Sequence, residues 1–278
     1  MSTELVAAIY GLSSAVSWGV GDFSGGLATK QKNVYSVVFI SQIFGLLALL
    51  VLAFISLEQL PSLNDIFWGI LAGTCGVLGI LALYSGLATN MGIVSPVSSV
   101  TTVIIPLLVG LFLETFPTPL QISGFLLALV AIWLVSGSNY TYHLQSLKLA
   151  VLAGTGFGFF LVFIDRVTTG ALFFPLVAAR LASLSVLTII LLTKRQIDAP
   201  KDLKMFIVIA LAGIFDIGGN TFFALATQTG RLDIAAVLTS FFPVVTVFLA
   251  WLILKEKITR LQIIGMVLAV FCIILITI

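Results

Sequence analysis

Two residues of opposite charge stand in the middle of long apolar stretches of the sequence. Arg180 lies about eight residues into the stretch 172–193, and Asp216 about twelve residues into 204–228. An ionisable group at the centre of a bilayer costs about 2.5–3.5 kcal/mol on insertion scales, so it marks a functional position by default. The guanidinium of Arg180 can bind a substrate carboxylate or phosphate through its planar fork, with Asp216 as resting partner or proton site. The alternative is a closed ion pair that only fixes helix packing.

Polar and aromatic residues follow Asp216 at helical spacing. Asn220 comes four residues later and Phe223 three further, so the three share one helix face. Gly218 and Gly219 permit the close approach of a neighbouring helix. We expect Asp216, Asn220 and Phe223 to line a substrate-binding cavity. A stripe that hydrogen-bonds only to other helices is the alternative.

Four further residues are candidates for a role near that cavity. Trp18 and Tyr84 each join an apolar ring to one polar group, which suits a cavity wall, although packing in the core or against lipid is the alternative. Asp22 and Asp165 lie toward the ends of their stretches at an offset of 143 residues. We expect them to act at a gate or in coupling, unless they are merely solvated helix ends.

The composition requires a membrane to surround these residues. The chain has 278 residues, of which 60% are hydrophobic and 9% charged. Soluble domains carry roughly 25% charged residues. A soluble domain, a disordered chain and a nucleic-acid binder are therefore excluded. One histidine and two cysteines outside any ligand spacing predict no metal and no cofactor.

The apolar stretches are long enough to cross a bilayer, which takes about 20 residues in a helix. We expect ten transmembrane helices in an all-α membrane protein, because the backbone must satisfy its own hydrogen bonds in lipid. The ten stretches are 5–29, 34–56, 65–89, 93–112, 119–136, 147–168, 172–193, 204–228, 233–253 and 260–278.

The two halves of the chain repeat each other. Ala88-Thr89-x-x-Gly92 matches Ala226-Thr227-x-x-Gly230, and Leu120-Gln121-x-x-Gly124 matches Leu261-Gln262-x-x-Gly265. The polar run from 137 to 146 separates domains at 1–140 and 147–278. Because each half holds five spans, an odd number, the second must enter from the opposite side. This predicts two inverted five-helix repeats, an architecture of secondary transporters with a site at the midplane.

Loose motifs add a family resemblance over the whole chain. They are Ser17-Trp18-Gly19, Pro243, Leu254-Lys255-Glu256-Lys257-Ile258-Thr259 and Leu261-Gln262-x-x-Gly265, with a degenerate first-half copy at Pro106, Glu114, Pro119, Leu120, Gln121 and Gly124. The chain resembles ten-helix transporters of the EamA type in the drug/metabolite transporter superfamily. The resemblance implies a central cavity and the transport, often export, of small metabolites. Related four-helix pumps carry an embedded glutamate in their first helix, whereas Glu4 lies at the edge here. Proton coupling is therefore not carried over.

Loop charges and family resemblance disagree about orientation. The odd-numbered loops and their flanks hold Lys30, Lys32, Lys148, Lys194, Arg195, Lys201, Lys204, Lys255, Lys257 and Arg260. The even-numbered loops hold Arg166 and Arg231. The positive-inside rule places the odd loops in the cytoplasm and the termini outside. The resemblance implies the reverse, and we follow the charges.

The function predicted from the sequence is secondary transport, not catalysis. We expect an exporter of a small polar or amphipathic metabolite, such as an amino acid, working by alternating access in the cell membrane. Its partners would be that substrate, the lipid bilayer and a proton as candidate coupling ion. One alternative is an enzyme like the intramembrane aspartyl proteases, because Gly19-Val20-Gly21-Asp22 matches their Gly-x-Gly-Asp motif. A channel or a structural scaffold is the other.

Overall fold

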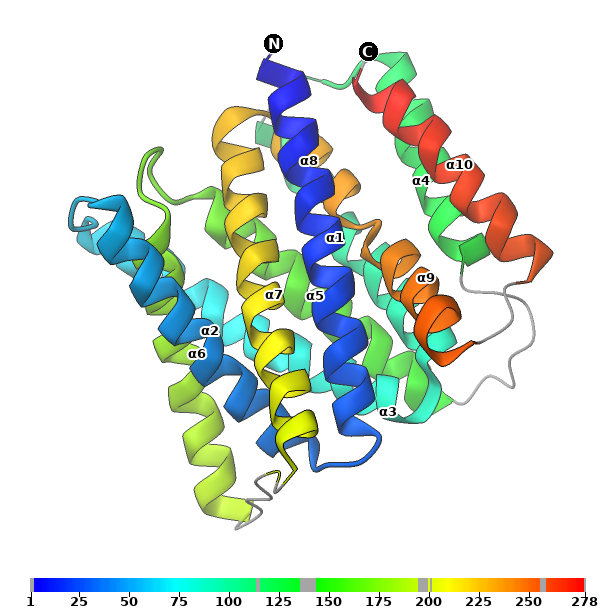
Figure 1. Ribbon diagram of the computed structural model, residues 1–278. Helices are drawn as coiled ribbons and strands as arrows, with labels where there is room; N and C mark the ends of the chain where they lie inside the picture. Colours follow the sequence, from blue (N-terminus) through cyan, green and yellow to red (C-terminus); the bar gives the residue numbers. More distant parts are fainter. Residues whose placement is uncertain are drawn as a thin grey trace.

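The computed structural model describes residues 3–113, 116–135, 144–194, 200, 202–255 and 259–277, and all regular structure within them is helical. The helices are α1 Thr3–Thr29, α2 Val34–Ser56, α3 Leu63–Leu113, α4 Pro119–Val135, α5 Leu144–Asp165, α6 Phe173–Lys194, α7 Leu203–Thr229, α8 Leu232–Thr239, α9 Phe242–Leu254 and α10 Arg260–Thr277. Figure 1 shows them as one bundle with both termini at the same end. Most of the predicted separator at 137–146 lies outside the described residues, as do Glu114, Arg195, Lys201, Glu256 and Lys257.

The helix divisions differ from the predicted stretches in two places. The stretches 65–89 and 93–112 were expected to be separate, but both fall within α3. A Cβ atom added to Gly86 would lie 2.6 Å from Cγ1 of Val94. Eight residues of straight helix rise about 12 Å. The chain must therefore turn sharply between these positions, and α3 consists of two apolar segments, Leu63–Ala88 and Val97–Phe112.

The predicted stretch 233–253 is also divided, into α8 and α9. Proline lacks a backbone N–H and is tolerated in the first turn of a helix, and Pro243 stands in the first turn of α9. At the break, the Ser240 N–H donates to the Ala236 carbonyl, and the Ser99 hydroxyl of α3 donates to the Ser240 carbonyl. The interruption is thus stabilised by a neighbouring helix, which apolar periodicity does not reveal.

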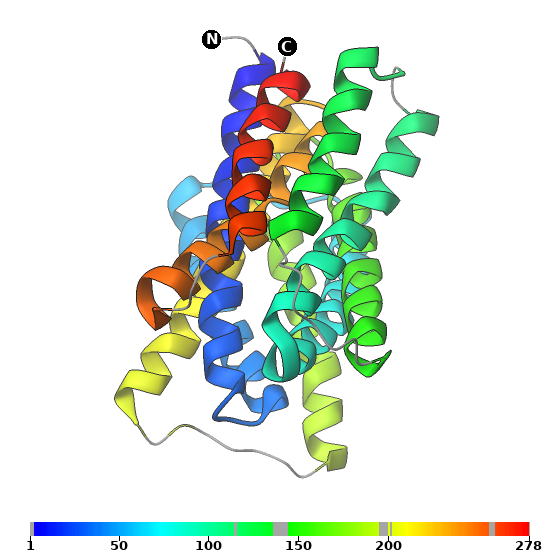
Figure 2. The same cartoon turned by 90° about the vertical axis from the view of Figure 1, so that its right-hand side faces the viewer.

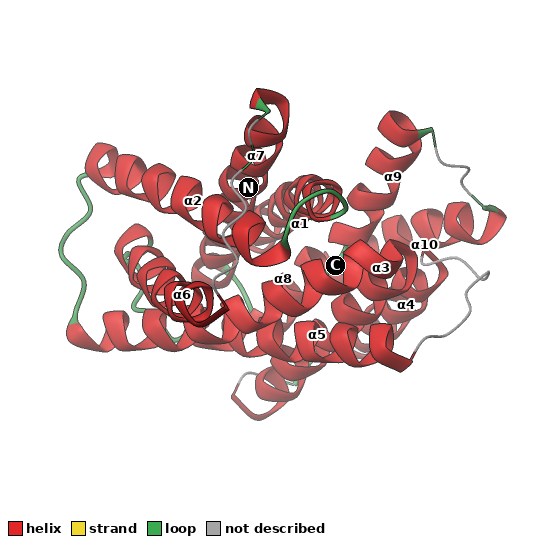
Figure 3. Cartoon of the chain, turned by 90° about the horizontal axis from the view of Figure 1, so that it is seen from below, coloured by secondary structure: helices red, strands yellow, loops and turns green. Residues whose placement is uncertain are grey.

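Helices of the two halves pack against each other in matched pairs. The most extensive contacts join α3 to α5 and α1 to α7, and others join α10 to α4 and α2 to α6. Exchanging the halves converts the first pair into the second and maps each of the other two onto itself. Figures 2 and 3 show the same arrangement from the side and from below, with α10 beside α4.

Glycines make the matched contacts possible. On α7, a Cβ at Gly213 would meet the Ser41 carbonyl oxygen of α2. On α3, a Cβ at Gly73 would meet the Ala179 carbonyl oxygen of α6. Ser41 and Ala179 are 138 residues apart, the offset that also separates Ala88 from Ala226. The repeat seen in the sequence is therefore present in the packing of α2, α3, α6 and α7.

For α1 and α5 the packing corrects the predicted alignment. Gly21 lies against the Ala212 carbonyl and the Asp216 nitrogen, and Gly156 lies against the Cys75 carbonyl and the Gly79 nitrogen. These contacts make Gly21 equivalent to Gly156, an offset of 135 rather than the 143 inferred from Asp22 and Asp165. The difference of eight residues is about two helical turns. Asp165 is the last residue of α5 and does not occupy a position equivalent to Asp22.

The outer surface of the bundle is apolar. Within the described residues, six helical segments are long and apolar enough to cross a membrane, and shorter apolar helices cover Val97–Phe112, Pro119–Val135 and Arg260–Ala269. Large side chains point outward along them, including Ile189, which is 63% exposed, and Leu126, which is 62% exposed. A soluble surface of this kind would aggregate, so these faces are suited to lipid.

Candidate functional site

A cavity lies inside the bundle and takes its walls from both halves of the chain. It encloses about 630 Å³ of empty space, part of which is continuous with the solvent. Small-molecule sites commonly measure 300–1,000 Å³. The lining residues are Trp18, Asp22, Gln42, Gly73, Gly76, Ile80, Thr102, Phe157, Phe160, Leu176, Ala179, Arg180, Ser183, Asp216, Asn220 and Phe242.

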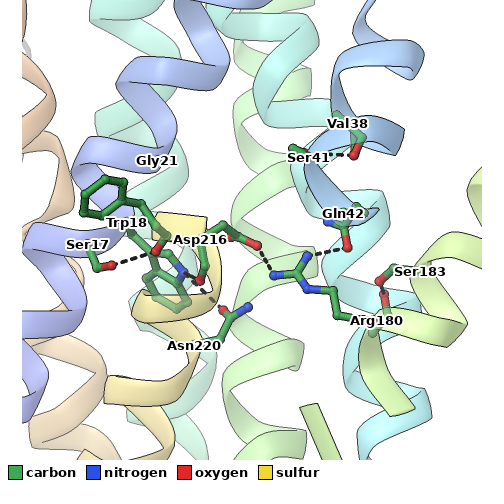
Figure 4. A network of polar contacts seen from close by, with 12 residues as sticks. Ser17, Trp18, Gly21, Val38, Ser41, Gln42, Arg180, Ser183, Asp216 and Asn220 are labelled. Carbon is green, nitrogen blue, oxygen red and sulfur yellow. Dashed lines mark hydrogen bonds and ion pairs between the residues drawn. The ribbon is translucent and has the colours of Figure 1, made fainter. Parts of the chain in front are cut away.

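Arg180 of α6 is the positive charge in this cavity, and its guanidinium has two partners. Nη2 forms an ion pair with Oδ2 of Asp216 on α7, and Nη1 donates to Oε1 of Gln42 on α2. Figure 4 shows the guanidinium between these two groups. The Arg180 residue is only 5% exposed. A buried guanidinium without such acceptors would be strongly destabilising, so these contacts make its position tolerable.

Gln42 was not predicted from the sequence, although a signal existed. It is a polar amide in the otherwise apolar helix α2, and the argument from depth applied to Arg180 would have identified it. Gln42 and Arg180 are 138 residues apart, the offset that relates α2 to α6. The two side chains therefore meet across the internal symmetry of the bundle.

Trp18 of α1 forms a wall of the cavity in a fixed orientation. Its indole Nε1 lies 3.1 Å from the Asp216 carbonyl oxygen and 3.1 Å from Oδ1 of Asn220, and donates to both. The ring stacks on Phe223 with centroids 6.3 Å apart and meets Phe160 edge-on at 6.4 Å. Phe223 is fully buried behind Trp18, whereas it was expected at the cavity wall.

Small residues hold α1 against α7 at the level of the cavity. The Ser17 hydroxyl donates to the Phe215 carbonyl at 2.7 Å, and the Ser14 hydroxyl donates to the Gly219 carbonyl at 2.8 Å. Gly21 brings the α1 backbone to the α7 backbone, where a Cβ would lie 3.2 Å from the Asp216 nitrogen. These contacts place Asp22, the next residue, at the depth of the ion pair.

Asp22 lines the cavity, although it was expected at a gate or rim. Its side chain is partly accessible. In the part of the chain that the structure describes, no group donates a hydrogen bond to its carboxylate or forms an ion pair with it. The cavity therefore contains an acid that the protein itself leaves without a partner.

Two other candidates lie away from the cavity. Tyr84 is fully buried, its hydroxyl is 3.5 Å from the Gly21 carbonyl, and its ring lies against Gly25. Asp165 ends α5 and does not line the cavity. Of the eight predicted site residues, the cavity thus brings together Trp18, Asp22, Arg180, Asp216 and Asn220.

The remaining lining residues had no distinctive signal in the sequence. Phe157, Phe160 and Phe242 belong to a chain with 22 phenylalanines, and the hydroxyl of Ser183 donates to the Gly73 carbonyl at 2.8 Å. Within the described residues, histidine, cysteine, aspartate and glutamate form no cluster of three or more that could hold a metal ion. The chemistry of the site is therefore that of one ion pair, a free carboxylate, amides, hydroxyls and aromatic rings.

Comparisons with known proteins agree with this architecture. A crystal structure of another protein superposes with a TM-score of 0.75 over 97% of this chain and 95% of that one, at 14% identity, which shows a shared fold. Curated protein sequences yield no match. The EamA-like transporter family matches residues 5–137 and again 145–278, so that two copies cover the chain. Together with the apolar helices, this match shows that the chain is a multi-pass membrane protein and that it belongs to the EamA-like transporter family.

Proposed function

We propose that this protein is a secondary carrier that exports a small polar or amphipathic metabolite, with amino acids as one candidate class, across the cell membrane. In this proposal ten membrane crossings form two inverted five-helix repeats, at 1–140 and 147–278, and a proton taken up by a cavity carboxylate is the coupling ion. The observation that carries it is a central cavity lined from both halves and crossed by the Arg180–Asp216 ion pair. Transporters of this architecture bind substrate near the midplane between repeats.

Alternating access requires contacts that close one end of the cavity and break when it opens. Hydrogen bonds of this kind join the loop at 166–172 to its neighbours at the end where the termini lie. The Glu58 carboxylate accepts from the N–H groups of Leu172 and Phe173, and Oδ1 of Asp65 accepts from Thr168 N–H at 2.8 Å. We call the contacts made by Glu58 and Asp65 the latch.

Gln228 of α7 adds to the closure of the same loop. Its Oε1 accepts from Gly170 N–H at 3.1 Å, and its Nε2 donates to the Ala171 carbonyl at 2.8 Å. The latch and Gln228 thus tie one loop to α7, to α3 and to the segment before α3. Their release would free this end of α6, which carries Arg180, to move relative to α7.

Counterflow in proteoliposomes tests the proposed carrier. Purified protein is loaded with a panel of unlabelled amino acids, amines, organic acids and sugars, and uptake of the labelled counterpart is measured. At least one member should exchange, and Arg180→Ala and Asp216→Ala should abolish that exchange. Arg260→Ala, a matched loss of an exposed arginine at the start of α10, should leave exchange unchanged. Normal exchange in both cavity variants would remove the site, and current through single channels would replace the carrier with a channel.

A further inference from the structure

Charge is unbalanced within the cavity. Its lining carries two aspartates, Asp22 and Asp216, and one arginine, Arg180, so its formal charge is −1 when both acids are ionised. The Arg180–Asp216 pair is internally neutral. The remaining negative charge resides on Asp22, whose carboxylate faces the cavity without a protein partner among the described residues. An isolated carboxylate in a poorly hydrated site is costly unless a cation or proton neutralises it.

An anionic ligand would meet an unfavourable exchange in the same cavity. Arg180 already uses Nη2 for Asp216 and Nη1 for Gln42. A ligand carboxylate that took Asp216's place would leave that aspartate unpaired, in addition to Asp22. Breaking one partner out of a buried pair costs about 3–5 kcal/mol, whereas a positive ligand at Asp22 breaks no existing contact.

The walls also suit a cation with an apolar body. Trp18, Phe157 and Phe160 line the cavity with Asp22, and Trp18 and Phe160 meet edge-on at 6.4 Å. Aromatic faces attract ammonium groups, with Trp the most favourable ring, and they also cover apolar carbon. A protonated amine that carries a ring or short hydrocarbon chain satisfies both properties of the site.

We propose that the cavity binds small organic amines, with the ligand ammonium on the Asp22 carboxylate and its apolar part against Trp18, Phe157 and Phe160. The proposal rests on the proposed carrier function and narrows its substrate class: an amine without a carboxylate is preferred to the corresponding amino acid. Asp22 is then the specificity-determining residue, and the Arg180–Asp216 pair remains closed around the ligand.

Isothermal titration with four ligands of matched shape tests this class. The probes are 2-phenylethylamine as cation, 2-phenylethanol as neutral analogue, 3-phenylpropionate as anion and phenylalanine as zwitterion, each at pH 7 with the purified full-length chain. The amine should bind at least tenfold more tightly than each of the other three. Asp22→Asn should weaken the amine at least tenfold and leave phenylethanol unchanged, and Asp22→Glu should retain most of the amine affinity.

A matched control and a folding measurement accompany these variants. Asp165→Asn makes the same chemical change at an acid outside the cavity and should bind the amine as the original chain does. The melting temperature of Asp22→Asn should not fall, because removing an unpartnered charge breaks no contact. Equal affinity for amine and alcohol, equal loss in Asp165→Asn, or tighter binding of phenylpropionate would each overturn the amine proposal.

Counterflow of the same four compounds separates this proposal from the carrier itself. If phenylalanine or phenylpropionate exchanges across the membrane while the amine neither exchanges nor competes, the protein is a carrier and the substrate class is wrong. If the amine binds through Asp22 but no compound exchanges, the binding site stands and the carrier function fails.

Discussion

At the scale of single residues, the cavity depends on how Arg180 is neutralised. Its guanidinium lies between an acid from α7 and an amide from α2, so three helices are joined at one buried group. A cation held in this way contributes little net stability, because the desolvation of both charges offsets their attraction. The pair therefore needs a reason other than stability, and the proposed carrier supplies one.

Replacing the pair together separates structure from function. Asp216→Leu alone should lower the free energy of unfolding by about 3–5 kcal/mol, because Arg180 is left as an uncompensated buried charge. The double variant Arg180→Met with Asp216→Leu should recover most of that loss and still fail to exchange substrate. Thermal unfolding in detergent and counterflow measure the two effects. Original exchange rates in the double variant would show that the pair only fixes helix packing.

Gln42 should matter for the same reason, with a smaller effect. Gln42→Ala removes the acceptor of Arg180 Nη1, and an unsatisfied buried donor costs about 1–3 kcal/mol. The melting temperature of the purified variant should fall accordingly. The exposed Gln31 offers a control of identical chemistry, and Gln31→Ala should leave the melting temperature unchanged. Equal melting temperatures for both variants would mean that another group takes up the Arg180 donor.

At the scale of elements, close helix approach is set by glycines that meet backbone rather than side chains. Gly213 faces the Ser41 carbonyl, which cannot move without shifting α2, whereas Gly76 faces the ring edge of Phe160, with a Cβ position 3.1 Å from Cδ2. Gly213→Ala should therefore destabilise the fold by about 1–3 kcal/mol, as overpacked cores do, and Gly76→Ala by less. Chemical unfolding of both variants checks the order, and the reverse order would contradict the proposed rigidity of the α2–α7 contact.

The latch makes a second prediction at this scale. Asp65→Ala removes the acceptor of Thr168 N–H, and hydrogen bonds to charged groups are worth about 1.5–3 kcal/mol, so opening at this end should become about tenfold more frequent. A cysteine placed at Leu176, buried in the cavity near this end of α6, reports it by its rate of modification with a maleimide in a background lacking Cys75 and Cys272. Asp202→Ala, which removes the N-cap of α7, should not change that rate. An unchanged rate in Asp65→Ala would show that the latch does not limit access.

At the scale of the whole molecule, apolar length predicted most helix bounds, and depth of charge predicted the centre of the cavity. The sequence could not locate the break at Ser240, because it depends on a hydroxyl from α3. Nor could it show that Phe223 lies behind Trp18, since both positions on a helix face are equally apolar. The alignment of Asp22 with Asp165 failed because two similar residues in glycine-rich helices align by chance, whereas the glycine contacts fix the true correspondence.

The inverted arrangement of the halves makes the last prediction. The segment 30–33 between α1 and α2 and the segment 166–172 between α5 and α6 hold corresponding places in the two repeats, yet they lie at opposite ends of the bundle, the first at the bottom of Figure 1 and the second at the top. In intact cells, an impermeant maleimide should modify a cysteine at Gly170 and leave one at Lys30 unmodified, because basic loops remain in the cytoplasm. Both positions are exposed, so burial does not limit the reaction. The reverse pattern would keep the inverted repeats and place both termini in the cytoplasm, as the family resemblance implies. Modification of both cysteines from the same side would mean that the repeats run in parallel, and a carrier built on inverted halves would then be untenable.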